Sequence, residues 1–388
     1  MVDNRIFIYS GNHGKPDGIE DYLMIFENVL GSKGFQIEVS NQLHENAINI
    51  IIDEFTNYSE NKKIIAFRKD NPNNICIFVL TEFVEKKFGV ESFNNFGGIF
   101  DAASIALINV YLRLKRDDFP SVRLKDFVLL LLFSPILGAY FLADYIKYKA
   151  LRLFRKNAVH PVGNFLKKQY SLFYFHMRYL GLKTLLKYAD AIITSHEFII
   201  QGYEKFDING KKLNFLGVIY SEFNKNQVLD SLMIGKKLYI EITGSITLYR
   251  QNFLNTINYY ISLMGLNKVF GLCKALPFSF LKEKVNRAAY SLHPPQTPDW
   301  KYCSPTRIYR AVAIEHNLPI LTKHFSQNPI EDVCLIMENH YSLIKMIEMY
   351  FNRQIMLDFI EPRIETYNNI VKQRNAIIVK SLKAIGSK

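Results

Sequence analysis

"RIFIYSGNHGKPDGIEDYLMIFENVLGSKGFQIEVS", residues 5–40, predicts a β-strand, a loop, a helix and a second β-strand. The first five residues are a short apolar run, and a glycine-bearing loop follows them. Apolar residues then recur at Ile19, Leu23, Phe26 and Leu30, the period of a helix that buries one face. The last six residues alternate as a strand does. This order is typical of a parallel sheet, so the stretch predicts an α/β fold.

The same alternation continues along the chain in two sets. Helices are expected at 252–264 and 307–315, and the segment from 341 to the end is mostly helical in pattern. Further strands are expected at 47–53, 75–81 and 191–195 in the first set, and at 213–219, 237–245, 289–294 and 318–322 in a second set that starts near residue 213.

Two similar α/β units with a cleft between them are the simplest architecture for this pattern. Residues 205–212 are the expected linker, which divides the chain into domains of residues 1–208 and 209–388. In open α/β sheets the ligand lies at the carboxyl ends of the strands. We therefore expect the functional site at those ends, facing the cleft.

Composition limits the class of protein. Of the 388 residues, 49% are hydrophobic and 22% charged, as in a folded globular chain. The four cysteines are scattered and form no CxxC pair, which argues against a zinc ribbon or a disulfide scaffold. A reducing, cytoplasmic setting is therefore expected. The chain opens with the strand-like run of residues 5–9 and shows no secretory signal.

The net charge of +12 is concentrated in residues 107–187, which hold 15 Lys and Arg against 4 Asp and Glu. Inside this block, residues 127–143 form a run of 17 uncharged residues, at the short limit for a membrane span. Ser134, Pro135 and Gly138 interrupt the run. Lysine and arginine interleaved with aromatic residues follow, a composition suited to an anionic lipid surface.

We therefore expect a membrane-associating segment about residues 107–187, lying on the inner face of the cell membrane. A buried pair of core helices with a solvated basic rim is the alternative. Nucleic acid is not an expected partner, because a long Leu/Phe run offers nothing to a phosphate backbone. The side chains expected at the membrane are Phe127, Leu130, Phe133, Leu137, Phe141, Lys147, Arg152 and Arg155.

"CSPTR", residues 303–307, begins the expected helix at 307–315 and offers donors for an anion. A helix N-terminus presents unpaired N–H groups and the positive end of the dipole. Ser304, Thr306 and Arg307 would add two hydroxyls and a guanidinium, which suit a phosphate. An ordinary helix start is the alternative, with Ser304 as N-cap and Pro305 at the first helical position.

Four stretches, taken together, resemble the GT-B superfamily of glycosyltransferases, in particular the family 4-like group. They are "YSGNHGKPDGIEDYL", "YADAIITSHEFIIQGY", "IEITGSITLYR" and "HPPQTPDWKYCSPTRIYRAVAIEHNLPILT". Each motif is weak alone, but their order and spacing are moderately specific. The resemblance covers most of the chain outside about residues 100–185. It implies two Rossmann-like domains facing a cleft, with the basic apolar block as a helical insertion in the N-terminal domain.

The resemblance also implies roles for individual residues. Gly244 and Ser245 would form the turn over the donor diphosphate, Arg250 would supply charge to it, and His293 would face the cleft. A solvated helix start is the alternative for Arg250. The start of the 307–315 helix would hold the phosphate. The loop glycines that would lie near the donor phosphates or the acceptor are Gly11, Gly14 and Gly18.

The candidates for the general base are His13, Glu20 and Asp21, in that order. A plain polar loop residue is the alternative for His13. Favourable charge in a first helical turn is the alternative for Glu20 and Asp21.

Two departures from the family pattern concern the donor site. The donor helix carries Glu315 as its only acid, too near the following strand to match the family's ribose-binding glutamate. Asn317 and Leu318 stand where a glycine usually precedes the proline of the last strand, and an asparagine can adopt the left-handed conformation there. There is also no convincing Asp-x-Asp motif, so no metal and no cofactor are expected.

The sequence thus predicts a metal-independent glycosyltransferase that moves a sugar from a nucleotide-sugar to a lipid-linked or surface-glycan acceptor, as in cell-envelope polysaccharide synthesis. Its expected location is cytoplasmic and peripheral, on an anionic membrane surface. Two alternatives stay open. One is another nucleotide-using α/β enzyme, such as an epimerase, and the other is a non-catalytic membrane-surface scaffold with a degenerate donor site.

Overall fold

The structure is a computed structural model that describes the chain in several stretches. The described residues are 5–11, 20–52, 58–71, 73–81, 135, 181–182, 184–197, 199–200, 213–242, 248–274, 288–294, 303–323 and 328–386.

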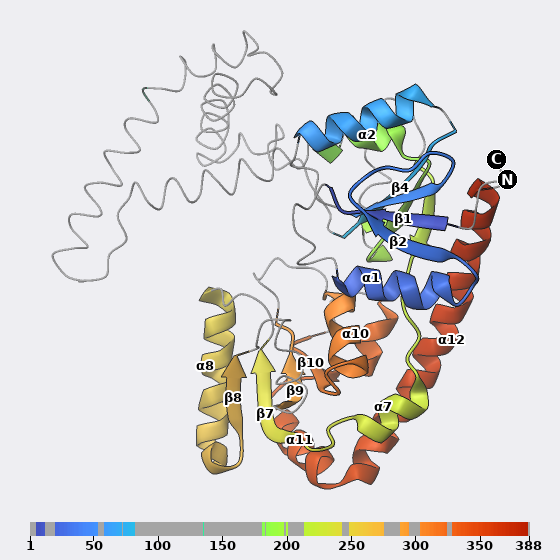
Figure 1. Ribbon diagram of the computed structural model, residues 1–388. Helices are drawn as coiled ribbons and strands as arrows, with labels where there is room; N and C mark the ends of the chain where they lie inside the picture. The colour runs from blue at the N-terminus through green and yellow to red at the C-terminus, as the bar shows by residue number, and fades with distance from the viewer. Residues whose placement is uncertain are drawn as a thin grey trace.

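Two parallel sheets organise the described residues (Figure 1). The first, called here the N-terminal sheet, contains β1 (Arg5–Tyr9), β2 (Gln36–Ser40), β3 (Ile48–Ile52), β4 (Ile75–Leu80), β5 (Ala191–Thr194) and β6 (Phe215–Val218). The second, the C-terminal sheet, contains β7 (Lys237–Ile242), β8 (Gly271–Lys274), β9 (Ala288–Leu292), β10 (Leu318–Leu321) and β11 (Leu335–Ile336).

The helices lie between and around these strands. They are α1 (Glu20–Phe26), α2 (Tyr58–Asp70), α7 (Lys225–Ser231), α8 (Leu248–Leu263), α10 (Pro305–Ala313), α11 (Tyr341–Phe351) and α12 (Arg353–Gly386). A π-helical turn, Glu27–Gly31, extends α1, and 3₁₀ turns occur at Leu186–Tyr188, Leu266–Lys268 and Pro329–Val333.

Both sheets have the same doubly wound strand order. The N-terminal sheet runs β2-β1-β3-β4-β5-β6, and the C-terminal sheet, counted from its other edge, runs β8-β7-β9-β10-β11. In each, the first strand lies between the second and the third, so the order reverses beside the first strand. Every strand pairing is parallel. The predicted α/β class is confirmed, and the two sheets fit two Rossmann-like units.

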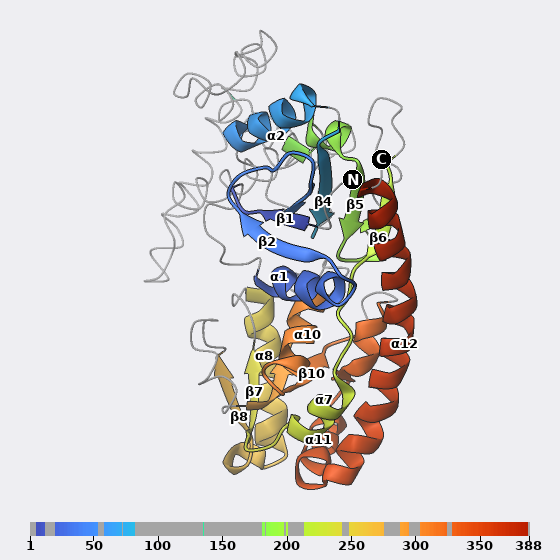
Figure 2. The same ribbon diagram turned by 45° about the vertical axis from the view of Figure 1, so that its right-hand side comes forward.

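The strands of the N-terminal sheet are buried on both faces, because alternate side chains join different apolar layers. Ile8 and Ile50 pack with α1 and with Ile378 near the end of α12. Ile51 and Phe78 pack on the opposite face with α2 and the segment before β5. Figures 1 and 2 show α2 and α1 on opposite sides of this sheet.

One predicted strand belongs to the other sheet. Residues 213–219 were expected in the second set, but β6 pairs with β5 at the edge of the N-terminal sheet. The composition of an apolar strand does not show which sheet the strand joins. Here Leu216 of β6 packs against the cluster that contains Ile378, near the end of α12. The predicted bounds of the two domains, the cleft and the helical insertion stay predictions.

The long helix α12 spans both sheets (Figure 2). Its first half packs in the core of the C-terminal sheet through Ile360 and Ile364, and its last turns pack on the N-terminal sheet. Between them, Asn375 donates from Nδ2 to the carbonyl oxygen of Tyr220 at 2.6 Å. The helix therefore holds the chain where it passes from one sheet to the other.

Candidate anion site at the carboxyl end of the C-terminal sheet

The candidate site lies where the strand order of the C-terminal sheet reverses. β7 and β9 are neighbours there. β8 follows on the far side of β7, and β10 follows on the far side of β9. In doubly wound sheets, ligands bind outside the carboxyl ends of the strands at such a point. Figure 1 shows β7 and β8 with their arrowheads directed toward the N-terminal sheet. Residues from α8, α10 and the end of β9 meet at this edge.

Arg250, the third residue of α8, is buried, with 4% of its surface exposed. Its Nε donates a hydrogen bond to the carbonyl oxygen of Pro294, 3.1 Å away, just after β9. Burial, together with the nearby charge of Arg307, lowers its pKa to about 10. Arg250 is therefore no solvated helix start, because it ties α8 to the end of β9.

His293 follows β9 directly and is buried. Its backbone N–H donates to the carbonyl oxygen of Ile320 at 2.9 Å, which fixes it beside β10. Burial, together with the charges of Arg307, Arg310 and Arg250, lowers the pKa of His293 to about 3. The imidazole is thus neutral at physiological pH, and three guanidinium groups lie close enough to act on it. We call Arg250, Arg307 and Arg310 the arginine cluster.

The start of α10 supplies two hydroxyls beside the arginine cluster. Ser304 is the N-cap residue, with extended backbone, and Pro305 occupies the first turn, as the helix-start alternative predicts. The Ser304 side chain makes no capping hydrogen bond, and its Oγ lies 3.1 Å from Oγ1 of Thr306. Thr306 is buried. The Ser304 hydroxyl therefore does not cap the first turn of α10.

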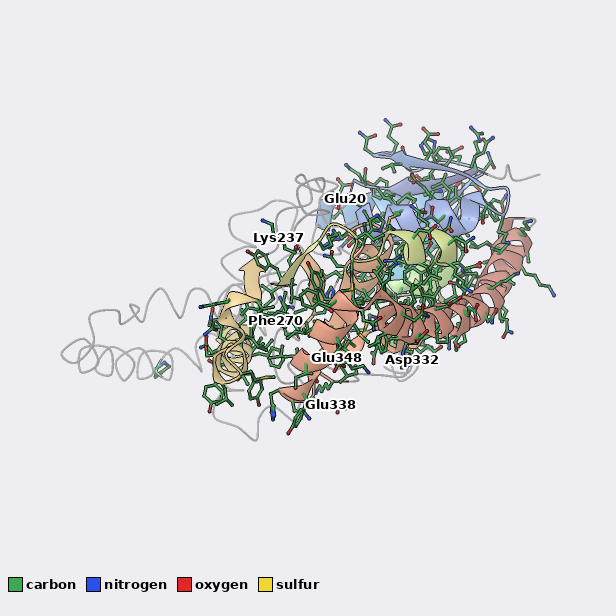
Figure 3. The ribbon with its side chains drawn as sticks, turned by 90° about the horizontal axis from the view of Figure 1, so that it is seen from below. Glu20, Lys237, Phe270, Asp332, Glu338 and Glu348 are labelled. Atoms are coloured by element: carbon green, nitrogen blue, oxygen red, sulfur yellow. The ribbon has the colours of Figure 1, made fainter. Side chains whose placement is uncertain are left out.

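The N-terminal half of the chain contributes an acid to this cluster. Oδ1 of Asp21, in the first turn of α1, lies 3.1 Å from Nη1 of Arg310. Burial raises the pKa of Asp21, and the charges of Arg310 and Arg307 oppose that rise. Glu20 precedes it at the start of α1 (Figure 3). The structure thus brings Asp21 to the predicted phosphate site through its ion pair with Arg310.

Glu315 is fully buried just after α10. Its Oε1 lies 3.3 Å from Nε of Arg310, and its carbonyl oxygen accepts from Nζ of Lys236 at 2.6 Å. Glu315 therefore helps to fix the position of the Arg310 guanidinium through its Nε. The left-handed residue of the turn that follows is His316, at φ 53°, and not Asn317 as expected. His316 can hold that conformation because its carbonyl oxygen accepts from the N–H of Met233 at 2.9 Å.

Two residues of the candidate site, Arg310 and His196, were not predicted from the sequence. Nε2 of His196, after β5, bonds the carbonyl oxygen of Cys303, and Nδ1 lies 2.7 Å from Oγ of Ser195. Burial lowers the pKa of His196 to about 4. The available signals were a polar pair at the end of a buried strand, and the i, i+3 spacing from Arg307 to Arg310.

The remaining predicted site residues lie outside the described residues. They are His13, Gly14, Gly18, Gly244 and Ser245 at the site, and Phe127, Leu130, Phe133, Leu137, Phe141, Lys147, Arg152 and Arg155 in the membrane-associating segment.

The described ranges contain neither a candidate membrane span nor a candidate metal site. No helix there combines the length and apolar character that crossing a membrane requires. Nor do three or more His, Cys, Asp or Glu side chains of those ranges gather in a way that could hold a metal ion.

Comparison with protein-family models and with curated proteins finds no match. Among solved structures, a chain from the crystal structure of a GtfA/B complex is similar over 53% of this chain, with 12% identity and a TM-score of 0.30. The match spans 48% of that chain, about half its length. So distant a likeness supports no conclusion about function.

Proposed function

We propose that the protein is a glycosyltransferase that holds the diphosphate of a nucleotide-sugar against the arginine cluster and the start of α10. The observation that carries this proposal is the convergence of three arginines on the buried, neutral His293 at the reversal point of a doubly wound sheet. The stretches that resemble GT-B glycosyltransferases include these same residues, which favours a nucleotide-sugar over other phosphate ligands.

The chemistry of the cluster fits a diphosphate. Guanidinium groups bind phosphate oxygens through paired N–H donors, and the hydroxyls of Ser304 and Thr306 add neutral donors. Fixed positive charge in a buried site stabilises the negative charge that develops on a leaving diphosphate. Arg250 is already held by Pro294, so it would need little reorganisation when the ligand binds.

The other parts of the reaction are assigned on the same basis. The acceptor hydroxyl would be deprotonated by His13, Glu20 or Asp21, which the sequence places in or beside the loop after β1. The arginines would do the work that a metal does in other transferases, so the proposed step is metal-independent. The acceptor is a lipid-linked sugar or a surface glycan, and residues 107–187 would hold the enzyme on the anionic cytoplasmic leaflet.

Turnover of nucleotide-sugars tests this function. UDP-, GDP-, CMP-, ADP- and TDP-sugars are incubated with the protein and vesicles carrying polyprenyl-phosphate lipids, and release of free nucleotide is measured without metal. We expect release from one donor class, and loss of that release in Arg307→Ala. Arg5→Ala is the matched control, because Arg5 is exposed and begins β1, whereas the proposed site involves the loop after the other end of that strand.

The other outcomes have definite meanings. Nucleotide binding with no sugar release would contradict glycosyl transfer and favour another nucleotide-using enzyme. Equal nucleotide release from Arg307→Ala and the wild type would contradict a role of Arg307 in the reaction.

A further inference from the structure

The contact between Asp21 and Arg310 joins α1 to α10, and so joins the two halves of the chain. Both side chains are mostly buried, at 16% and 15% exposed. The carboxylate oxygens of Asp21 lie 3.1 and 3.4 Å from Nη1 of Arg310. Charge-assisted hydrogen bonds are usually about 2.7–2.9 Å long. This pair is therefore close enough to balance charge but longer than a tight ion pair.

The charges around Asp21 come from both halves. Arg310 and Arg307 of α10 favour its ionised form, while Glu315 after α10 and Glu20 on its own helix disfavour it. Arg307 and Arg310 are also two of the three cations that act on His293. The carboxylate of Asp21 thus faces the cations that the proposed diphosphate would use.

We propose that Asp21 is the internal counter-anion of the arginine cluster, and that a bound diphosphate displaces it from Arg310 and loosens α1 from α10. This inference rests on the proposed function, since it requires the diphosphate to bind at the cluster. A diphosphate carries more negative charge than a carboxylate and presents more acceptor oxygens, so it competes well for a guanidinium. Arg310 stays oriented throughout, because Glu315 contacts its Nε.

A second pair of polar contacts with the C-terminal half is also long. Nδ2 of Asn28, in the π-helical turn after α1, lies 3.3 Å from Oγ of Ser221 and 3.4 Å from the hydroxyl of Tyr309. Release of Asp21 would remove a charge-balanced link between α1 and α10. Donor binding would in this way change how α1, which carries two of the proposed base candidates, sits over the site.

Calorimetric titration with inorganic pyrophosphate tests the competition. Removing the internal competitor by Asp21→Asn should tighten pyrophosphate binding by about fivefold, the worth of a partly exposed ion pair. Asp230→Asn is the matched control, because it removes an exposed aspartate of α7, and it should leave the affinity unchanged. Arg310→Lys should weaken binding, since a lysine loses the paired donors.

Hydrogen exchange of the wild type provides a readout that needs no variant. Amides of α1, residues 20–26, should exchange faster when pyrophosphate is bound. Unchanged or weaker binding by Asp21→Asn, or slower exchange in α1, overturns the displacement while leaving the donor site in place. Absence of any pyrophosphate or nucleotide binding by the wild type overturns the donor site, and the displacement with it.

Discussion

Arg250 and Pro294 connect the two elements that flank the reversal point of the C-terminal sheet, through a hydrogen bond of 3.1 Å from Nε to the carbonyl oxygen. The bond holds a buried arginine of α8 over the end of β9, next to His293. A buried guanidinium is costly unless it is hydrogen-bonded, and the carbonyl oxygen of Pro294 provides one such bond. The same bond fixes the guanidinium at the edge where we propose that a diphosphate binds.

The first prediction concerns Arg250 itself. Arg250→Lys keeps the positive charge but loses the Nε donor, whereas Arg250→Met loses both. We expect nucleotide affinity to fall moderately in the lysine variant and by about tenfold or more in the methionine variant, since a charged hydrogen bond contributes roughly 1.5–3 kcal/mol. Titration calorimetry measures both. Equal affinities in the two variants would show that charge at this position does not matter.

The second prediction concerns pH. His293 and His196 have pKa values of about 3 and about 4 in the folded chain, against about 6.5 when unfolded. The unfolded state therefore binds protons first as the pH falls below 6.5, and stability is lost toward pH 4. At pH 5 the loss is about 2 kcal/mol per histidine.

Urea denaturation at pH 7 and pH 5 measures this loss, and His196→Gln serves as the comparison. The glutamine variant should lose about 2 kcal/mol less stability between the two pH values than the wild type. The same pH dependence in both proteins would mean that His196 does not stay neutral in the fold.

The third prediction concerns the link between α12 and the segment that follows β6. Asn375 donates to the carbonyl oxygen of Tyr220 and accepts from its N–H, at 2.6 and 3.5 Å. Asn375→Leu leaves both buried backbone groups without that partner, so we expect a loss of roughly 2–4 kcal/mol in unfolding free energy. Gln373→Leu, two residues earlier on an exposed position of α12, is the control. Similar losses in both variants would contradict the assignment.

The fourth prediction concerns the proposed membrane segment. Flotation with vesicles of anionic lipid should carry the protein, and vesicles of neutral lipid should leave it behind, because residues 107–187 hold most of the net charge. Replacement of Lys147, Arg152 and Arg155 by glutamate should abolish flotation. Binding that is indifferent to lipid charge would contradict an electrostatic surface contact.

Much of the fold was accessible from the sequence because buried parallel strands are short, apolar and bounded by polar residues. Arg5–Tyr9 was predicted with its observed bounds, and most other strands to within a few residues. The sheet to which β6 belongs could not be predicted, because the end of α12, which packs against Leu216 of β6, lies more than 130 residues further along the chain. Periodicity reports burial and says nothing about which distant segment provides it.

The site was predictable where the residues lie close together in sequence. The residues at the start of α10 were found from "CSPTR", and the fold brings Arg250 and His293 beside them. Pairing across the two halves was not visible, so Asp21 was expected as a base and its partner Arg310 was overlooked. His196 was missed for the same reason, because its contact with Cys303 joins residues 107 positions apart.

The most direct test of the central claim is a thermal-shift screen of UDP, GDP, CMP, ADP and TDP without metal, on the wild type and on Thr306→Ala/Arg307→Ala. Ligands that bind only the folded state raise the melting temperature, by an amount that grows with the logarithm of the ligand concentration divided by Kd. We expect one nucleotide to stabilise the wild type and the double variant to lose that shift. No shift in the wild type, or an equal shift in both proteins, would contradict a phosphate site at the start of α10.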